Sequence, residues 1–562
     1  AVHLFHNYKI ELDEGKKSSE AIINSVKDIG GAMFLAMITT VIAFMSFFTA
    51  TVPAIKDFGL LLGLGVFYTF VTAITILPAF RYILDRNKKA IKPKKSKVFD
   101  VSYVMSKVAR VILHHNKKIL IIMIILSVFL AFNAVNLNTG FDIQQFAPKD
   151  TPSIELFEEI SDKFPSSTQT QEYILIEGNV ATVDTLKGIY NTHYNFRDDT
   201  FIAKNPDDSL KTNSIYTVIQ DAVEINQSIA TKFNIDNVTG IPKTDNDVKN
   251  LFDYLYGKEG FSFNDFNMDS FDMTNLQDFN YQEIQMGEIS TQTKNVLNKN
   301  DRGQYDATVI RIYVSFQVEE PTSQTFDDTL GLLKEELEND LSDYGTATAE
   351  VTGSNTITLT ITNSLTESQI LSTFVSIILA AIVLIIAYKN PLLGLVALIP
   401  VGLTMIWVLG TMYVIGYSLN ALTITITSIT IGIGIDYSIH ATERFRLVAD
   451  KTGDIEKAMC ETISHTGGAL LIAALTTACG FGILAFAPIP PQQQFGVILS
   501  ITIMYSLFTT ILILPSVLVS WAKWRRKSKG YIVTTNGMKK IDGKWVKTKK
   551  ENKNEKEDSC KK

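Results

Sequence analysis

The sequence lacks the residue clusters that mark most enzymes and metal proteins. Its 562 residues include only 3 cysteines, at positions 460, 479 and 560, so the long middle of the chain has no disulfide framework. The sequence shows no cluster of metal-ligating side chains, no nucleophile triad and no phosphate-binding loop. We therefore expect neither an enzyme nor a bound cofactor.

Charge is also missing from long parts of the chain. Asp, Glu, Lys and Arg are absent from residues 29–55, 58–80, 119–141, 368–388, 390–435 and 466–522. A membrane helix needs about 20 apolar residues, so each of the two longest stretches has room for two crossings. Gly416-Tyr417-Ser418 and Pro488-Ile489-Pro490-Pro491 interrupt these two stretches.

These stretches predict a polytopic α-helical membrane protein with eight spans. The predicted spans are 29–50, 58–80, 119–136, 368–388, 392–413, 419–440, 466–487 and 495–521. Buried core helices of a soluble protein can have the same composition, but eight of them in one chain favour the membrane.

The distribution of charge predicts the orientation. Residues 136–366 carry 38 acidic and 15 basic residues, whereas Lys and Arg are concentrated in 81–118 and 523–562. Basic loops remain in the cytoplasm, so we expect a cell-membrane protein with a large extracytoplasmic domain and a cytoplasmic C-terminus. We interpret the basic segments as topology signals that contact anionic membrane lipids, without nucleic-acid binding.

One acidic residue interrupts the apolar pattern. Asp436 lies in the string IGIGIDYSIHATERF, seven residues before the next charge at Glu443. A carboxylate in a low dielectric is biased towards its neutral form, and intramembrane acids are commonly functional. Gly432 and Gly434 remove side-chain bulk so that a neighbouring helix can approach closely. His440 lies one turn further on, and we interpret it as an interfacial residue.

Hydroxyl side chains lie near Asp436 in the predicted spans. Thr425 and Ser428 precede it on the same span, and Thr476 and Thr477 lie on the next. These four residues could hold a file of water that leads to the carboxylate. Ordinary packing between helices is an equally good explanation.

The chain contains an internal repeat with a constant offset of 437 residues. Gly30-Gly31-Ala32 matches Gly467-Gly468-Ala469, and Thr39-Thr40 matches Thr476-Thr477. Further matches follow without a gap: Pro53 with Pro490, Phe58-Gly59 with Phe495-Gly496, and Leu77-Pro78 with Leu514-Pro515. Repeated membrane halves are typical of secondary transporters. The counterpart of Asp436 would precede Ala1, so we expect an N-terminal half of the same chain that this sequence does not include.

The repeat divides the chain into six segments. Residues 1–80 are the end of the first membrane repeat, with its last two helices, and 81–118 form a basic linker with an interfacial helix. Residues 119–136 are the first helix of the second repeat, 137–366 the extracytoplasmic α/β domain, and 367–521 the remaining five helices. Residues 522–562 form a basic tail, which we expect to be disordered.

The match carried by Gly432-Ile433-Gly434-Ile435-Asp436-Tyr437, the repeated Gly-Gly and Thr-Thr pairs and the closing Leu514-Pro515 identifies a family resemblance. The chain resembles transporters of the resistance-nodulation-division (RND) superfamily, in the MmpL-like and hydrophobe/amphiphile efflux branch, with Patched-type proteins as distant relatives. The resemblance covers residues 1–521. It implies that Asp436 and Tyr437 relay protons opposite a like pair in the first repeat. Some RND pumps also use a membrane-embedded lysine, which the predicted spans of this chain lack.

The large domain shows an α/β pattern. Residues 172–176 and 307–314 alternate as strands do, and helical patterns cover 182–194 and 322–342. The resemblance implies a ferredoxin-like porter domain here. Residues 245–300, rich in Asn, Asp and Phe, read as an insertion of helices or a mobile lid.

Three functions are compatible with this sequence. The first is proton-driven export or transbilayer transfer of lipids or other hydrophobic or amphiphilic molecules, with a possible homo-oligomer. We expect a proton as the coupling ion, although the sequence does not distinguish it from sodium. The second is a lipid- or sterol-sensing, Patched-like receptor without net transport. The third is an accessory of protein translocation resembling SecD and SecF.

Overall fold

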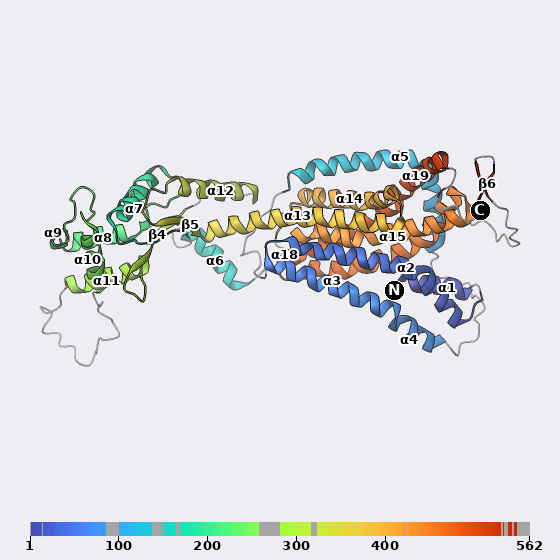
Figure 1. Cartoon of the computed structure of the whole chain (residues 1–562), viewed down its shortest axis with the longest axis horizontal. Coiled ribbons are helices and arrows are strands. Elements are labelled where there is room, and N and C mark those ends of the chain that lie inside the picture. The colour runs from blue at the N-terminus through green and yellow to red at the C-terminus, as the bar shows by residue number, and fades with distance from the viewer. Residues whose placement is uncertain are drawn as a thin grey trace. The chain divides into compact units, whose positions relative to one another are not determined.

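The chain forms two compact units. The computed structural model describes residues 2–13, 15–85, 101–137, 148, 151–164, 169–257, 281–315, 323–420, 422–529, 532, 538–541 and 544–547. Residues 1–149 and 362–562 form a helical unit, and residues 150–361 form an α/β unit. Both are seen in Figure 1.

The helical unit is a bundle of long helices. Its first part contains α1 (Val2–Asp13), α2 (Ser18–Met45), the 3-10 turn η1 (Ser46–Thr49), α3 (Pro53–Ile74), α4 (Ile76–Asp85) and α5 (Val101–Val135). Its second part contains α13 (Ser354–Tyr388), α14 (Pro391–Val414), α15 (Ile426–Thr452), α16 (Ile455–Glu461), α17 (Gly467–Gly482), η10 (Ile483–Phe486), α18 (Pro490–Phe508) and α19 (Leu514–Lys529). Within the described residues, 7 helical segments are long and apolar enough to cross a membrane. The prediction of a polytopic helical membrane protein is confirmed.

The one predicted span that is not among these 7 segments, 419–440, corresponds to α15, which is too polar to be counted with them. It packs against α2, α14 and α18, and buried residues occur on several of its faces. Because protein contacts cover it, its threonines and glycines do not have to face lipid. The predicted bounds were wrong: α15 starts at Ile426 and continues to Thr452, where Gly453 with φ 67° ends it. Hydropathy predicts only the apolar part of a helix, and α15 continues into the charged residues that follow this part.

Other helices also exceed their predicted bounds, among them α2, which begins at Ser18, and α19, which runs to Lys529. α13 is one continuous helix of 35 residues that begins at Ser354, in the α/β unit, before the predicted start at 368. α5 joins the predicted linker helix to the span at 119–136, with a kink at His115 (φ −116°, ψ 22°). Before the kink, Met105, Ala109 and Ile112 are buried in the core of the helical unit. The predicted position of this segment on the membrane surface stays a prediction.

The sequence repeat is also a repeat of backbone structure. α2, η1 and α3 correspond to α17, η10 and α18, and both 3-10 turns and both following prolines differ by the same offset of 437. A Cβ added at Gly59 would lie 2.6 Å from the carbonyl oxygen of Phe44. A Cβ added at Gly496 would lie 2.7 Å from the carbonyl oxygen of Phe481. The repeated glycine therefore allows the same close crossing in both copies.

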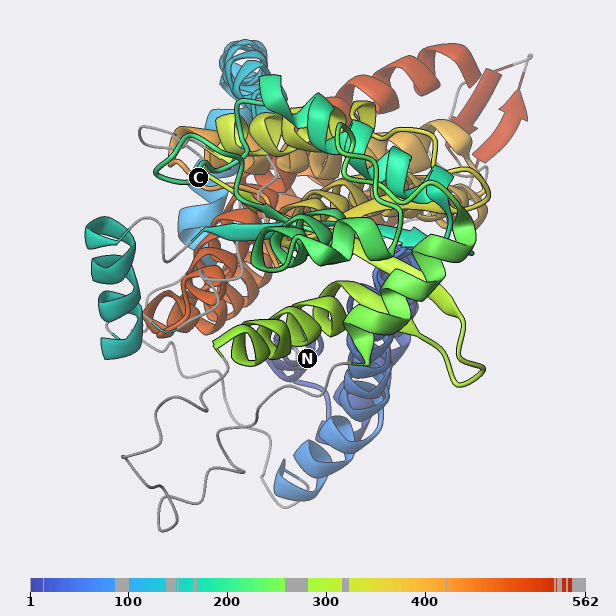
Figure 2. The same ribbon diagram turned by 90° about the vertical axis from the view of Figure 1, so that its left-hand side faces the viewer.

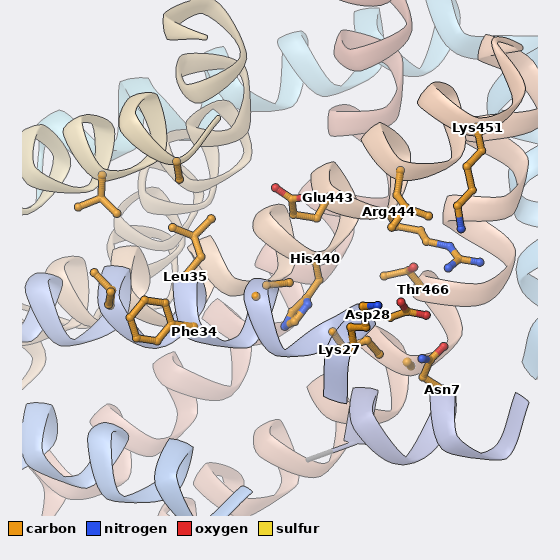
Figure 3. A pocket seen from close by; sticks show the side chains of 18 of the residues that line it. Asn7, Lys27, Asp28, Phe34, Leu35, His440, Glu443, Arg444, Lys451 and Thr466 are labelled. Atoms are coloured by element: carbon orange, nitrogen blue, oxygen red, sulfur yellow. The ribbon is translucent and has the colours of Figure 1, made fainter. Parts of the chain in front are cut away.

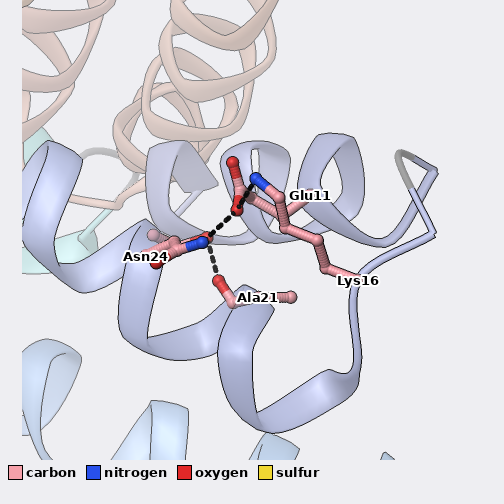
Figure 4. A network of polar contacts seen from close by, with 5 residues as sticks. Glu11, Lys16, Ala21 and Asn24 are labelled. Atoms are coloured by element: carbon pink, nitrogen blue, oxygen red, sulfur yellow. Dashed lines mark hydrogen bonds and ion pairs between the residues drawn. The ribbon is translucent and has the colours of Figure 1, made fainter.

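A buried carboxylate holds α1 against α2. Glu11 is 8% exposed and accepts hydrogen bonds of 2.8 Å from Lys16 Nζ and from Asn24 Nδ2, as Figure 4 shows. Burial alone raises the pKa of Glu11, but the bonds from Lys16 and Asn24 outweigh it and lower this pKa below its ordinary value.

The α/β unit, which Figure 2 views from its end, is built on an antiparallel sheet. Its strands are β1 (Thr170–Glu177), β2 (Thr212–Asn213), β3 (Leu297–Lys299), β4 (Tyr305–Val314) and β5 (Thr348–Gly353). The order is β2-β4-β1-β5, with β3 paired to β4. α7 (Val183–Asn195) lies between β1 and β2 in the chain, and α12 (Ser323–Asn339) lies between β4 and β5. This split β-α-β arrangement confirms the predicted ferredoxin-like topology.

Helices inserted between β2 and β4 complete the core of this unit. They are α8 (Ile215–Ile225), α9 (Ser228–Lys232), α10 (Asp245–Tyr256) and α11 (Tyr281–Val296). Phe252 and Ile289, from the segment predicted as an insertion or mobile lid, are buried in the same core as Ile174 and Ile310 of the sheet. The described part of this insertion is therefore packed helix, while residues 258–280 lie outside the described residues.

Glu172 connects the sheet to the start of α13. This side chain is 0% exposed and accepts hydrogen bonds from the backbone of Asn355 (2.7 Å) and from the hydroxyl of Thr356 (2.7 Å). Burial raises its pKa above the ordinary value for glutamate. A glutamate from β1 thus caps the first turn of the helix that continues into the bundle.

The tail contains a short hairpin. β6 (Met538–Ile541) pairs with β7 (Lys544–Lys547), so the prediction that residues 522–562 are disordered was wrong for this part. The sequence places Asp-Gly between the two strands, and this pair strongly favours a tight hairpin turn.

Candidate functional site

Asp436 lies on α15 where α2 passes close to it. The Thr40 hydroxyl oxygen is 3.0 Å from Asp436 Oδ1, 2.8 Å from the carbonyl oxygen of Gly432 and 2.9 Å from that of Ala36. A threonine hydroxyl has one proton to donate. It can therefore serve only one of these three acceptors at a time.

Gly432 and Gly434 face neighbours on two sides, and the approach is tighter than an ordinary contact only at Gly434. A Cβ added at Gly432 would lie 3.5 Å from Ala43 Cβ and from Thr40 Cγ2, both on α2. A Cβ added at Gly434 would lie 3.1 Å from Ser506 Oγ on α18, whose hydroxyl donates to the Gly434 carbonyl at 3.3 Å. The two glycines serve different neighbours, α2 and α18.

Asp436 has no countercharge in the described part of the chain. None of the ion pairs found there involves it. Tyr437, the other predicted relay residue, is 7% exposed, and its ring belongs to the core of the helical unit. A partly buried carboxyl with a hydroxyl donor and no cation can be either charged or neutral without breaking an ion pair.

A stripe of serines on α13 faces α2 and α15. Ser368, Ser372 and Ser376 recur every four residues, and each is at most 2% exposed. Helical spacing places them on one face. This stripe was not predicted, although three serines at helical spacing in a mostly apolar span were a signal for it.

Hydroxyl groups on the two neighbouring helices meet this stripe. Ser368 Oγ is 2.9 Å from Thr51 Oγ1, just beyond α2, and Ser376 Oγ hydrogen-bonds to Ser46 Oγ. Ser372 Oγ is 3.5 Å from Ser428 Oγ on α15. These contacts form a column of hydroxyls along the junction of α2, α13 and α15.

The four residues predicted to line a water path lie in different places. Ser428 belongs to the hydroxyl column, and the buried Thr425 donates to the carbonyl of Leu422 at 2.7 Å. On α17, Thr476 is exposed and Thr477 is partly buried, and the hydrogen bonds recorded for both go to carbonyls of α17 itself.

The hydroxyl that bonds Asp436 is the repeat counterpart of Thr477. Thr40 differs from Thr477 by the offset of 437 residues. The repeat match between the two threonines is visible in the sequence, but only Thr477 was predicted to lie near Asp436. Packing in three dimensions brings the helix of the other repeat to Asp436 instead.

Comparison with known proteins agrees with this architecture. A model of the MMPL family matches residues 1–110 and 145–548. Putative membrane protein MJ1562 of Methanocaldococcus jannaschii is 33% identical over 153 residues, which are 27% of this chain and 39% of that protein. The hopanoid transporter HpnN of Rhodopseudomonas palustris is 33% identical over 120 residues, which are 21% of this chain and 13% of that protein.

A solved structure shows the same fold. The hedgehog release protein Disp from the water bear Hypsibius dujardini aligns over 92% of this chain and 61% of its own length, with a TM-score of 0.60 and 15% identity. The alignments with the two curated relatives cover 39% or less of their lengths. Since the family model covers most of the sequence and the repeated bundle matches in structure, the chain belongs to the MMPL family, within the RND superfamily.

Proposed function

We propose that this chain forms part of a secondary transporter that moves lipids or other hydrophobic or amphiphilic molecules across or out of the membrane, driven by protons. The contact between Asp436 and Thr40 is the observation that carries the proposal. It joins an acid within the bundle to a helix of the other repeat.

Protonation of Asp436 would change this contact. When Asp436 is ionised, the Thr40 proton is best directed to Oδ1, because a bond to a charged acceptor is the stronger one. When Asp436 is neutral, the same proton can turn to the carbonyl of Gly432 or Ala36, which lie at similar distances. Loading the acid thus alters the hydrogen bond between α2 and α15, and with it the relation between the two repeats.

The hydroxyl column supports a polar route to this region. Ser368 and Ser376 of α13, with the partners described above, provide donors and acceptors in a span that is otherwise apolar. Together with a few waters, such groups can carry protons, and a route lined by apolar side chains cannot. We propose that protons reach Asp436 along this junction and that Tyr437 assists the relay.

The substrate class rests on the relatives. HpnN is named as a hopanoid transporter, and another relative, of Bacillus anthracis, is named as an apo-petrobactin exporter. We propose a hydrophobic or amphiphilic substrate, export as the direction, a proton as the coupling ion, and no enzymatic activity or cofactor. Contacts with membrane lipids and assembly into a homo-oligomer belong to the same proposal.

The test is transfer of a fluorescent lipid in proteoliposomes under an imposed pH gradient. We expect transfer to depend on the gradient, and Asp436→Asn to abolish that dependence while Asp436→Glu retains part of it. A dye inside the vesicles would report whether protons move with the lipid.

Transfer by Asp436→Asn at the unsubstituted rate would eliminate the proposed role of this acid. Saturable lipid binding without any effect of the gradient would favour the lipid-sensing alternative.

A further inference from the structure

A cavity of about 630 Å³ lies between α2, α13 and α15, near the end of the bundle where α13 terminates. Its volume lies within the roughly 300–1,000 Å³ range of small-molecule sites. Figure 3 shows side chains of α2 and α15 facing each other across it. Along α15 its lining residues His440, Arg444, Leu447 and Lys451 follow helical spacing.

The lining of the cavity is polar at one end and apolar at the other. Lys27, Arg444 and Lys451 carry positive charge, and Figure 3 draws Arg444 and Lys451 at the same end of the view. Phe34 and Leu35 lie at the opposite end of the same view. Phe34 is 50% exposed, so the apolar end opens at the surface of the bundle.

The positive charges in the lining outnumber the acids. Within the described part of the chain, the recorded ion pairs involve neither Lys27 nor Arg444 nor Lys451. Glu443, the neighbour of Arg444 on α15, is bonded to Arg446 at 2.7 Å. Arg444 Nε is buried without a hydrogen-bond partner. Asp28 is the other acid in the lining, so the cations are in excess.

We propose that this cavity binds one anionic phospholipid from the adjoining membrane leaflet. Its phosphate would pair with Arg444, Lys451 and Lys27, and one acyl chain would lie along Phe34 and Leu35. Arginine and lysine beside a membrane surface attract anionic headgroups, and the guanidinium group can bond phosphate oxygens in pairs. A soluble phosphate would leave the apolar end empty, whereas a zwitterionic lipid would add a fourth cation to a site that already has three. This site is independent of the proposed transport activity.

Lipid retention measured by native mass spectrometry tests the proposal. The protein is prepared in mixed vesicles or nanodiscs of phosphatidylglycerol and phosphatidylcholine, and the lipids that remain bound are counted. We expect one phosphatidylglycerol to be retained preferentially, and Arg444→Gln/Lys451→Gln to reduce its retention about tenfold, as the loss of charged hydrogen bonds would.

Two further variants make the test specific. Arg526→Gln/Lys529→Gln removes the same number of charges from exposed positions of α19 and should leave retention unchanged. Gly31→Leu adds bulk to the lining at a position where a Cβ would meet no atom within 4 Å. It should block the lipid while every charge remains.

Equal loss in the α19 variant would show diffuse attraction to basic segments and would overturn the proposal. Retention of the lipid by Gly31→Leu, or displacement by millimolar inorganic phosphate alone, would contradict a site that holds an acyl chain.

Discussion

At the scale of single residues, the Thr40 hydroxyl lies within hydrogen-bond distance of three acceptors, one of which is Asp436. We expect Thr40→Val, which keeps the shape and removes the donor, to lower gradient-driven lipid transfer about tenfold, since a hydrogen bond to a charged group contributes about 1.5–3 kcal/mol. Thr40→Ser should retain most of the activity. Initial rates in proteoliposomes measure the effect.

Thr430→Val is the matched control for that experiment. Thr430 is as buried as Thr40, lies on the same helix as Asp436, and donates to the Ile426 carbonyl of its own helix. If both substitutions slow transfer equally, the effect reflects helix packing and not the contact with the acid.

A second residue-level prediction concerns the α/β unit. Burial, together with the hydrogen bond and the charge of Asp340, raises the pKa of Asp199 to about 8. Because this pKa lies above the value of 3.8 for the unfolded chain, the folded state binds the proton more tightly. The contribution to stability is complete below about pH 4 and is lost as the pH rises towards 8.

Asp199→Asn should therefore make the α/β unit more stable at pH 8 and have a smaller effect at pH 5. Protection of α12 peptides against hydrogen exchange, corrected for intrinsic rates at each pH, measures the change. Asp208→Asn, at a position whose side chain is 84% exposed, serves as the control. A gain of the same size at both pH values would contradict the argument.

At the scale of elements, the crossings of α2 with α3 and of α17 with α18 share one repeated glycine that meets backbone, Gly59 and Gly496. We expect Gly59→Ala to destabilise the protein by about 1–3 kcal/mol, because the new Cβ would meet backbone. Gly65→Ala, on the same helix but with no atom within 4 Å, should be neutral or stabilising by up to about 1 kcal/mol. Thermal unfolding in detergent compares the two.

At the scale of the whole molecule, labelling can test on which side of the membrane the α/β unit and the end of α19 lie. In a background without the natural cysteines, a membrane-impermeant maleimide should label Val238→Cys in intact cells, since that side chain is 88% exposed in the α/β unit. Lys529→Cys, at the end of α19, should react only after the membrane is opened. The reverse pattern would invert the topology predicted from the basic segments.

The sequence predicted the architecture more completely than the contacts of the site. Absence of charge located the spans, and Pro490 marked the break before α18, because both are local properties. The extent of α15 beyond His440 was not predictable from hydropathy, since backbone hydrogen bonding continues where the apolar residues end. Asp436 was predicted because an acid among apolar residues stands out within a single stretch of sequence. Thr40 and Ser372 were not, because their roles depend on which helices pack together.

The constant offset between the two repeats also provides an internal comparison within one chain. Gly59 and Gly496 meet the same backbone atoms in their respective copies, whereas Thr40 reaches another helix and Thr477 is bonded within its own. Any substitution can thus be introduced twice, 437 positions apart, in nearly the same local geometry. If a substitution destabilises the protein in one copy and not in the other, the difference reports the contacts with neighbouring helices, because the local helix geometry is nearly the same in both copies.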